Sequence, residues 1–485
     1  MEAAAWLAGQ AERTIETAMA RVFLVGDLAF KQKKTVSFSY GDLSTPERRH
    51  WALERELAFN QPAAPALYRG LRRVTRRAGG GLEVDGPGDL VDLVLEMRRF
   101  PDEAVLANDP AALDGEAAEA LGRTIAELHG RAPPRRGTGL ELTIPSNAQI
   151  LGELAPQLGA RETAALVAET QAEYERRRPH LEARADAGFS RRCHGDLHLG
   201  NILLEDGRAT PFDCIEFNDA LSDIDVLYDL AFLLMDLGFR DRRDAAVRVL
   251  GGYLDQAARH FDDRVWDGLI ALPLFQSVRA TVRAHVSAHS GDLALARRYV
   301  AAAREHLRPR PARLVAVGGR SGSGKSSVAR ALAPALGAAP GAVILRSDEA
   351  RKRLAGVGST DAAGRETYTP DIDARVFAAL FDGAGRLLRA GHSVVLDATF
   401  LDPALRARAE ALAKAARVRF DGVWLQASLE TLAGRVAARR GDASEATLEV
   451  LQAQMRRDPG ELSWTRLDAA GRAEATARRW LDAFA

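Results

Sequence analysis

One string in the second half of the chain constrains its fold more than any other feature. The segment from Gly319 to Ser326 reads Gly-Arg-Ser-Gly-Ser-Gly-Lys-Ser and matches Gly-x-x-x-x-Gly-Lys-Ser at every defined position. An apolar run at 314–317, typical of a buried strand, precedes it, and a helical pattern at 327–336 follows it. In this strand–loop–helix order, backbone N–H groups at the helix N-terminus attract phosphate groups. The string therefore predicts a nucleotide-binding loop on a parallel α/β sheet.

The same loop predicts which residues hold the nucleotide. Lys325 would neutralise charge on the β- and γ-phosphates, and the hydroxyl group of Ser326 would ligate magnesium. ATP and Mg²⁺ are thus the expected cofactors. The other phosphate contacts are expected from the rest of the loop, at Gly319, Ser321, Gly322, Ser323, Gly324 and Ser327.

Two carboxylates follow later strands of the same expected sheet. Asp348 comes shortly after the apolar run 342–346, and Asp397 ends the run 393–397. Ligands of open α/β sheets bind at the carboxyl ends of strands, so both side chains are expected at the nucleotide site. We predict that Asp348 binds the phosphate acceptor or acts as a base, and that Asp397 lies near the water shell of the magnesium ion. Helix capping is the alternative role for both.

The helical segment 432–439 carries two arginines, Arg435 and Arg439, on one face. We interpret the segment as a lid that closes over ATP and stabilises charge on the transferring phosphoryl group. The alternative is a pair of solvated arginines in an Arg-rich protein.

A second string, upstream, points to the same chemistry. It reads His194-Gly-Asp-Leu-His-Leu-Gly-Asn201 and is followed by Asp213. Phosphoryl transfer requires a carboxylate near the acceptor hydroxyl and oxygen ligands for magnesium. Asp196 and Asn201 have the Asp-x-x-x-x-Asn spacing of a kinase catalytic loop. We predict that Asp196 orients or deprotonates the acceptor hydroxyl, and that Asn201 and Asp213 hold magnesium.

A lysine and a glutamate complete this predicted nucleotide site. Lys31 and Lys33 share one face of an expected strand, so either of them would hold the α- and β-phosphates. Glu56, in the helical segment 47–60, is the expected partner of that lysine, in preference to Glu54. A solvated basic edge is the alternative interpretation of the lysines. Three later acidic residues are interpreted as backbone caps: Asp219, Asp225 and Asp229.

These motifs resemble known families. The upstream string resembles the catalytic loop of the aminoglycoside phosphotransferase and choline kinase group, His-Gly-Asp-x-His-x-x-Asn, at every defining position. The resemblance implies an α+β bilobal protein-kinase-like fold that acts on small molecules. The downstream set of phosphate loop, strand-Ser-Asp, strand-Asp-Ala-Thr-Phe and paired arginines resembles the zeta-toxin and gluconate-kinase-like P-loop kinases. Nearly the whole chain is similar to bacterial proteins that join these two domains.

The sequence also indicates where the first domain ends and the second begins. Its 485 residues are more than one hydrophobic core usually organises. The stretch 307–313 contains two prolines and three arginines, which a helix does not readily cross. We therefore predict a protein-kinase-like domain at 1–308 and an α/β P-loop domain with a parallel sheet at 309–485.

Composition and net charge limit the kinds of substrate and partner that we expect for this chain. Lys+Arg and Asp+Glu both total 66, and this zero formal net charge argues against a nucleic-acid substrate. The two cysteines are too few for a disulfide framework, and we see neither a secretory signal nor an apolar run long enough for a bilayer. We expect a cytoplasmic kinase without membrane association, whose acceptor is a hydroxyl group of a small molecule. The alternatives are a nucleotide-gated regulatory protein, in which one module only binds or hydrolyses ATP, and a toxin-like kinase acting on nucleotide-sugars or macromolecules.

Overall fold

A computed structural model describes residues 2–38, 41–358, 361, 363–438 and 447–484 of the chain. These residues form two compact units, each of which is considered by itself. The first comprises Met1–Leu113, Arg131–Ser146 and Glu182–Leu233, and the second comprises Asp114–Gly130, Asn147–Leu181 and Leu234–Ala485. None of the helices in the described ranges is both long enough and apolar enough to cross a membrane.

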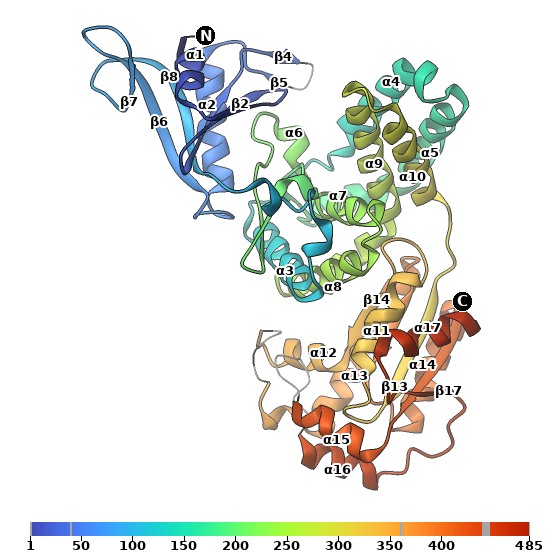
Figure 1. The fold of residues 1–485 in the computed structure, drawn as a ribbon. Helices are drawn as coiled ribbons and strands as arrows, with labels where there is room; N and C mark the ends of the chain where they lie inside the picture. The colour runs from blue at the N-terminus through green and yellow to red at the C-terminus, as the bar shows by residue number, and fades with distance from the viewer. Residues whose placement is uncertain (1, 39–40, 359–360, 362, 439–446, 485) are drawn as a thin grey trace. The chain divides into compact units, whose positions relative to one another are not determined.

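A six-stranded antiparallel sheet dominates the first unit (Figure 1). Its order is β1-β2-β3-β8-β6-β7, which places β3 and β8 in the middle. The strands are β1 (Arg13–Glu16), β2 (Ala20–Val25), β3 (Leu28–Lys33), β6 (Tyr68–Arg76), β7 (Leu82–Val84) and β8 (Asp89–Arg98), and a separate short hairpin joins β4 (Ser37–Phe38) to β5 (Gly41–Asp42).

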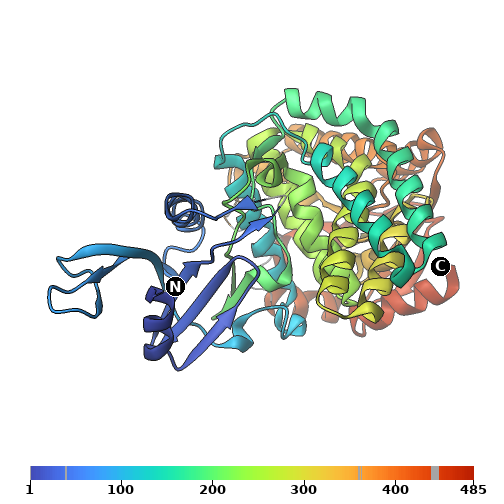
Figure 2. The ribbon, with the colours of Figure 1, turned by 90° about the horizontal axis from the view of Figure 1, so that it is seen from above.

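Two helices cover this sheet, α1 (Glu2–Gln10) and α2 (Pro46–Asn60). Consecutive side chains of a strand point to opposite faces, and Val94 and Leu95 of β8 are both fully buried. Leu7 of α1 packs in the cluster of Val94, whereas Leu53 of α2 packs in the cluster of Leu95. The two helices therefore lie on opposite faces, and Figure 2 shows α1 in dark blue beside the strands.

The upstream string lies in the remaining part of the first unit, among short elements. The hairpin β10–β11 reverses at Asp206 and Gly207, which both have a positive φ, while β9 pairs antiparallel with β12. The elements are β9 (Ser190–Arg192), η3 (Leu199–Asn201), β10 (Ile202–Glu205), β11 (Arg208–Pro211), α6 (Asp219–Ser222), β12 (Asp223–Asp225) and α7 (Val226–Phe239), preceded by η1 (Asp102–Ala104) and η2 (Pro110–Ala112). The upstream string thus lies among loops held by short antiparallel pairs.

The second unit contains a five-stranded parallel sheet in the order β14-β15-β13-β16-β17. This confirms the expected α/β P-loop fold. Four strands coincide with the apolar runs 314–317, 342–346, 393–397 and 420–425 of the sequence. The fifth, β17, was not predicted, because its four residues alternate between half-buried and exposed and form no apolar run. The strands are β13 (Arg313–Gly319), β14 (Val343–Arg346), β15 (Val394–Asp397), β16 (Arg419–Gln426) and β17 (Thr465–Asp468).

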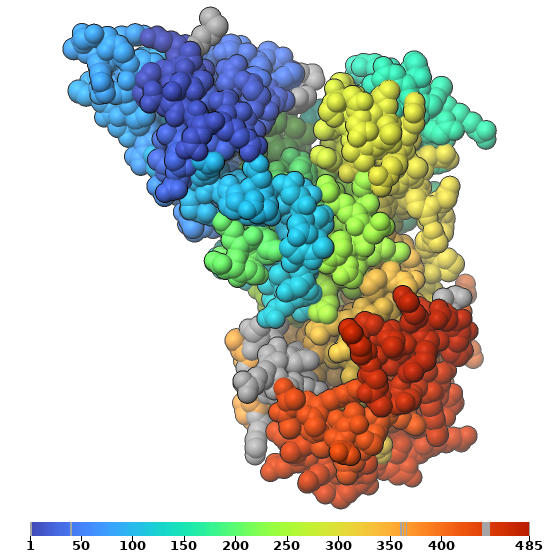
Figure 3. Space-filling view, viewed as in Figure 1, coloured from blue at the N-terminus to red at the C-terminus, as the bar shows by residue number. Residues whose placement is uncertain are grey.

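Helices cover both faces of this sheet (Figure 1). On one face, Val315 and Val317 of β13 pack with Leu332 of α11 and Trp480 of α17. Residues near the C-terminus form part of the visible surface of this unit (Figure 3). The helices are α11 (Lys325–Leu332), η5 (Ala333–Ala335), α12 (Ser347–Leu354), η6 (Arg365–Thr367), α13 (Pro370–Arg389), α14 (Pro403–Ala416), α15 (Leu429–Ala438), α16 (Leu448–Arg456) and α17 (Ala473–Phe484).

A helical region precedes the sheet in the same unit. Val247 of α8 belongs to the hydrophobic cluster that holds Leu332, so this region and the sheet share a core. The unit continues through residue 309, and the domain boundary expected there stays a prediction. The helices are α3 (Gly115–Arg131), α4 (Leu140–Leu158), α5 (Ala160–Asp186), α8 (Arg243–Phe261), η4 (Asp263–Ala271), α9 (Leu272–His289) and α10 (Leu293–Leu307), of which the start of α4 and the end of α5 extend into the first unit.

Candidate active sites

A buried carboxylate fixes the loop that begins the upstream string. Asp229, which is fully buried, accepts hydrogen bonds from the backbone N–H groups of His194 over 3.1 Å and of Gly195 over 2.8 Å. The ring of His194 lies 2.9 Å from the backbone oxygen of Phe212, which ties this loop to the segment before Asp213. Asp229 therefore caps the backbone, as the sequence indicates, and the next residues project from a rigid turn.

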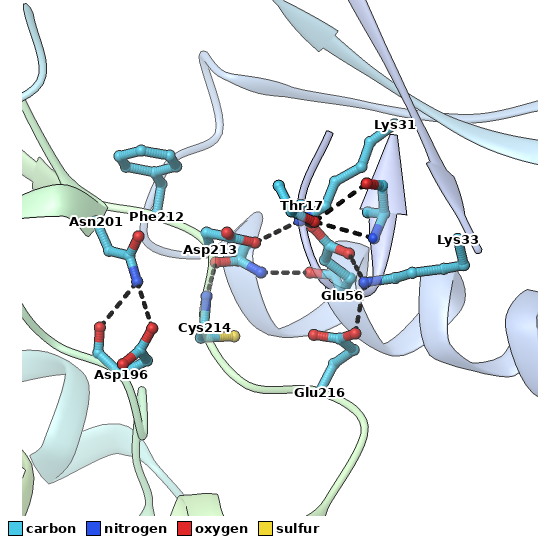
Figure 4. A network of polar contacts seen from close by, with 12 residues as sticks. Thr17, Lys31, Lys33, Glu56, Asp196, Asn201, Phe212, Asp213, Cys214 and Glu216 are labelled. Carbon is cyan, nitrogen blue, oxygen red and sulfur yellow. Dashed lines mark hydrogen bonds and ion pairs between the residues drawn. The ribbon is translucent and has the colours of Figure 1, made fainter. Parts of the chain in front are cut away.

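Asp196 and Asn201 meet in this loop. The side-chain nitrogen of Asn201 donates to the backbone oxygen of Asp196 over 2.9 Å and to its carboxylate over 3.0 Å. Figure 4 shows the Asn201 nitrogen toward Asp196 and the oxygen turned away. The Asn201 oxygen, an acceptor, therefore points away from Asp196, whose side chain is 38% exposed.

A network of two lysines and three carboxylates lies beside this loop (Figure 4). Lys31 pairs with Glu56 at 2.6 Å and also contacts the carboxylate of Asp213. Lys33 pairs with the other oxygen of Glu56 at 2.7 Å and with Glu216 at 2.5 Å. Glu56 thus joins both candidate lysines. Sequence reasoning missed Glu216, although it belongs to the segment Pro-Phe-Asp-Cys-Ile-Glu that contains Asp213.

Burial and the ion pairs of this network shift the pKa values of its members. Burial alone would lower the pKa of Lys31, but Asp213 and Glu56 raise this pKa well above its ordinary value. Burial would raise the pKa of Asp213, yet the Lys31 ammonium group outweighs burial and lowers it. Burial raises the pKa of Glu216, although Lys33 opposes the shift. Asp213 is therefore ionised at neutral pH and available to a cation.

The backbone of Asp213 adds a second local feature. Its φ is +61°, in the left-handed region that non-glycine residues rarely occupy, and its N–H donates to the hydroxyl group of Tyr68 over 3.0 Å. Strained residues of this kind persist where their surroundings over-determine them, often at functional sites. Together with the Asn201 oxygen, the Asp213 carboxylate offers the all-oxygen donors that Mg²⁺ prefers.

The downstream loop joins β13 to α11 and depends on its glycines. Gly322 and Gly324 have φ of +81° and +84°, and a Cβ on Gly322 would lie 2.4 Å from the backbone oxygen of Leu432. Lys325 begins α11, and its ammonium group donates to the backbone oxygen of Arg320 over 3.2 Å. Backbone N–H groups and a lysine thus converge at a helix N-terminus, which is the arrangement that binds phosphate.

The two residues that the sequence places near magnesium in this unit are in contact. The hydroxyl group of Ser326 donates to the carboxylate of Asp397, at the end of β15, over 2.6 Å. Hydroxyl and carboxylate oxygens again suit Mg²⁺. Asp348 follows β14 in the first turn of α12 and is half-buried. The parallel sheet thus brings the ends of β13, β14 and β15 to one edge, as expected.

Other predicted residues of this loop lie as follows. Ser321 and Ser323 are buried and Ser327 is exposed. The N–H group of Ser321 donates to the side-chain oxygen of Gln454, on α16, over 2.8 Å. Gln454 had no signal in the sequence, because it belongs to no motif and lies 133 positions away.

One of the two predicted lid arginines can be placed. Arg435 donates to the backbone oxygens of Ala469, Ala470 and Gly471 over 2.7–3.1 Å. A Cβ on Gly324 would lie 3.9 Å from its guanidinium group, so α15 rests beside the phosphate loop. Arg439 lies outside the described residues, and the lid role of the pair stays a prediction.

Comparisons with known proteins match both regions. The model of the phosphotransferase enzyme family matches residues 46–269, and the AAA domain model matches residues 314–458. Uncharacterized proteins from Mycobacterium tuberculosis and Mycobacterium bovis are each 31% identical over 476 residues, which cover 94% of this chain and 92% of theirs.

Solved structures similar to part of the chain include two kinases. A gluconokinase from Sinorhizobium meliloti is 28% identical over 36% of this chain and 92% of its own, with a TM-score of 0.26. An APS kinase from Mycobacterium tuberculosis is 22% identical over 36% of this chain and 98% of its own, with the same TM-score.

Proposed function

The chain belongs to a family of two-domain proteins that join a phosphotransferase domain to an AAA-type P-loop domain, and from this premise we propose that both modules transfer the γ-phosphate of ATP to a small-molecule hydroxyl group. The kinase-family domains support a phosphotransferase enzyme that uses ATP. One observation carries the proposal: each unit contains a lysine suited to phosphate groups and oxygen ligands suited to Mg²⁺. The contact that represents the first site is Lys31 with Asp213, and the contact that represents the second is Ser326 with Asp397.

In the first module, the acceptor hydroxyl binds beside Asp196, whose carboxylate accepts its proton as the oxygen attacks the γ-phosphorus. Asn201 orients that carboxylate through its side-chain nitrogen. Lys31 holds the ATP phosphates, because it reaches both Glu56 and the carboxylate of Asp213. Asn201 and Asp213 would hold Mg²⁺, which when bound neutralises charge on the phosphates.

Lys33 takes a different part in this scheme. Its side chain is 3% exposed and is enclosed by Glu56 and Glu216, whose side chains are equally buried. A lysine with two buried carboxylate partners is held in the protein interior rather than presented to a nucleotide. We therefore assign the phosphates to Lys31, and assign to Lys33 the task of anchoring Glu56 and the loop after Asp213.

In the second module, the phosphates of ATP lie in the loop before α11 and Lys325 neutralises their charge. Ser326 and Asp397 would hold Mg²⁺, which supplies the same charge neutralisation there. Asp348 receives the acceptor hydroxyl at the carboxyl end of β14. The alternative, a module that only binds or hydrolyses ATP, predicts turnover that no acceptor stimulates.

A transfer assay with γ-labelled ATP tests the proposal. The full-length protein, incubated with a metabolite extract, should label small molecules, and Asp196→Asn and Lys325→Ala should each remove a different subset of products. Asp348→Ala should remove acceptor-stimulated turnover at the second site while leaving ATP affinity nearly unchanged. If ATP is hydrolysed at the same rate with and without extract, and no metabolite is labelled, the kinase assignment is wrong.

A further inference from the structure

One buried guanidinium group joins three residues around the downstream phosphate loop. Arg346, the last residue of β14, donates through Nη2 to Ser326 Oγ over 3.1 Å and through Nε to Asp397 Oδ2 over 3.2 Å. Its Nη1 donates to Glu349 Oε1 over 3.1 Å. The side chain is 5% exposed. Parallel pairing of β14 with β15 places Arg346 directly opposite Asp397, so the sheet itself sets this contact.

Arg346 restricts the hydroxyl group of Ser326. A hydroxyl has one O–H donor and two lone pairs. Ser326 donates to Asp397 and accepts from Arg346, which leaves one lone pair in a fixed direction. A hydroxyl held in this way reaches a metal ion without first having to reorient. The arginine thereby prepares Ser326 for magnesium.

Arg346 also compensates the charge of Asp397. That carboxylate is 4% exposed, and a buried charge without a partner is strongly unfavourable. The guanidinium group offsets the carboxylate charge and, together with Ser326, occupies Asp397 Oδ2, which leaves the second oxygen as the open acceptor. The contact is therefore more than packing, because it determines which acceptor positions of the pair stay open.

The third contact reaches the helix that carries the predicted acceptor residue. Glu349 lies in the first turn of α12, directly after Asp348. Arg346 thus links the phosphate loop through Ser326, the end of β15 through Asp397, and α12 through Glu349. Nucleotide, magnesium and acceptor are each assigned to one of these three elements.

We propose that Arg346 is a positioning residue for phosphoryl transfer in the second module, where it orients Ser326 and Asp397 toward magnesium-bound ATP and fixes them relative to α12. The proposal rests on the function proposed above for this module. Its consequence is specific: ATP without magnesium binds nearly independently of Arg346, whereas the affinity gained from magnesium depends on it.

Titration calorimetry on the full-length protein tests this. A non-hydrolysable ATP analogue is titrated with Mg²⁺ and again with a chelator, and the second-module site is the one that Lys325→Ala abolishes. Arg346→Gln should bind the magnesium-free analogue like the wild type but lose roughly tenfold to a hundredfold of the gain from magnesium, the worth of charge-assisted hydrogen bonds. Arg346→Lys should recover only part, because an ammonium group cannot make the three directed contacts.

Arg353→Gln provides the matched control. Arg353 lies on α12, the helix that Arg346 contacts through Glu349, but it pairs with Asp255 rather than with the loop, so this variant should keep the full magnesium gain. The full gain in both Arg346 variants would overturn the proposal. An equal loss of affinity with and without magnesium would overturn it too, because that result indicates general damage to the fold. If the wild type and Lys325→Ala bind the analogue alike, the proposed function of the module fails together with this inference.

Discussion

Asp255, on α8, pairs with Arg353, on α12, at 2.9 Å within the second unit. The first residue belongs to the region that matches the phosphotransferase family, and the second to the region that matches the AAA domain. Arg330 of α11 pairs in the same way with Glu119 of α3 at 3.2 Å. The helices that follow the phosphate loop and β14 are thus both held by the helical region that precedes the sheet.

Gly383, which packs against Trp266, predicts how much the fold loses when one methyl group is added there. A Cβ on Gly383, inside α13, would lie 2.4 Å from the ring of Trp266, which is 2% exposed. Gly383→Ala should therefore destabilise the protein by about 1–3 kcal/mol through overpacking. Gly434 of α15 has no atom near its Cβ position, so Gly434→Ala should stabilise by roughly 0.5–1 kcal/mol. Denaturant unfolding checks both, and equal effects of the two substitutions would contradict the close packing on Trp266.

Substitutions of Lys33 and of Lys31 should have different effects. Lys33→Met leaves Glu216 and Glu56 short of a buried cation, so it should cost about 3–5 kcal/mol of unfolding free energy. Adding Glu216→Gln should recover much of that loss. Lys34→Met is the matched control, because its partner Glu16 is exposed and such pairs contribute about 0–1 kcal/mol.

Lys31→Met should instead weaken nucleotide binding in the first module, which calorimetry with an ATP analogue would detect. The assignment of the phosphates to Lys31 is wrong if Lys33→Met, in a variant that stays folded, removes this binding while Lys31→Met preserves it.

Asp196→Asn should abolish transfer by the first module and spare its nucleotide binding. Asparagine keeps the size of the side chain but cannot accept the acceptor proton, so the rate should fall by roughly 10²–10⁴-fold. The measurement is labelled-phosphate transfer, in a Lys325→Ala background that silences the second module. Near wild-type transfer by this variant would exclude Asp196 as the base.

The raised pKa of Glu349 implies that the free energy of unfolding depends on pH. Burial, together with the carboxylates of Asp255 and Glu119, raises the pKa of Glu349 to about 7 against the opposing charges of Arg346 and Arg330. Because the folded-state pKa exceeds the unfolded value of 4.5, its contribution to stability is complete below that value and is lost as pH rises through about 7. Glu349→Gln, which stays neutral, should therefore gain stability relative to the wild type as pH rises from about 4.5 to about 7. Unfolding midpoints at both pH values test this, and a constant difference would refute it.

The sequence by itself determined the parts of both sites that lie within one loop. Gly319 to Ser326, and Asp196 with Asn201, were predictable because their spacing along the chain fixes their spacing in space. The parallel sheet followed from apolar runs separated by helices, since buried parallel strands are continuously apolar. Only β17, polar and half-exposed at the sheet edge, escaped this pattern.

Only the tertiary structure decided which distant residues complete these sites. Lys33 and Glu216 are 183 positions apart, and Arg346 and Asp397 are 51 positions apart. Strand alternation put Lys31 and Lys33 on one face, but their different partners depend on where α2 and the loop after Asp213 pack. The roles of Arg346 and Gln454 likewise depend on the order of strands and the placement of α16. A motif records local geometry, whereas a buried ion pair exists only after the chain has brought both charges out of water to the same place.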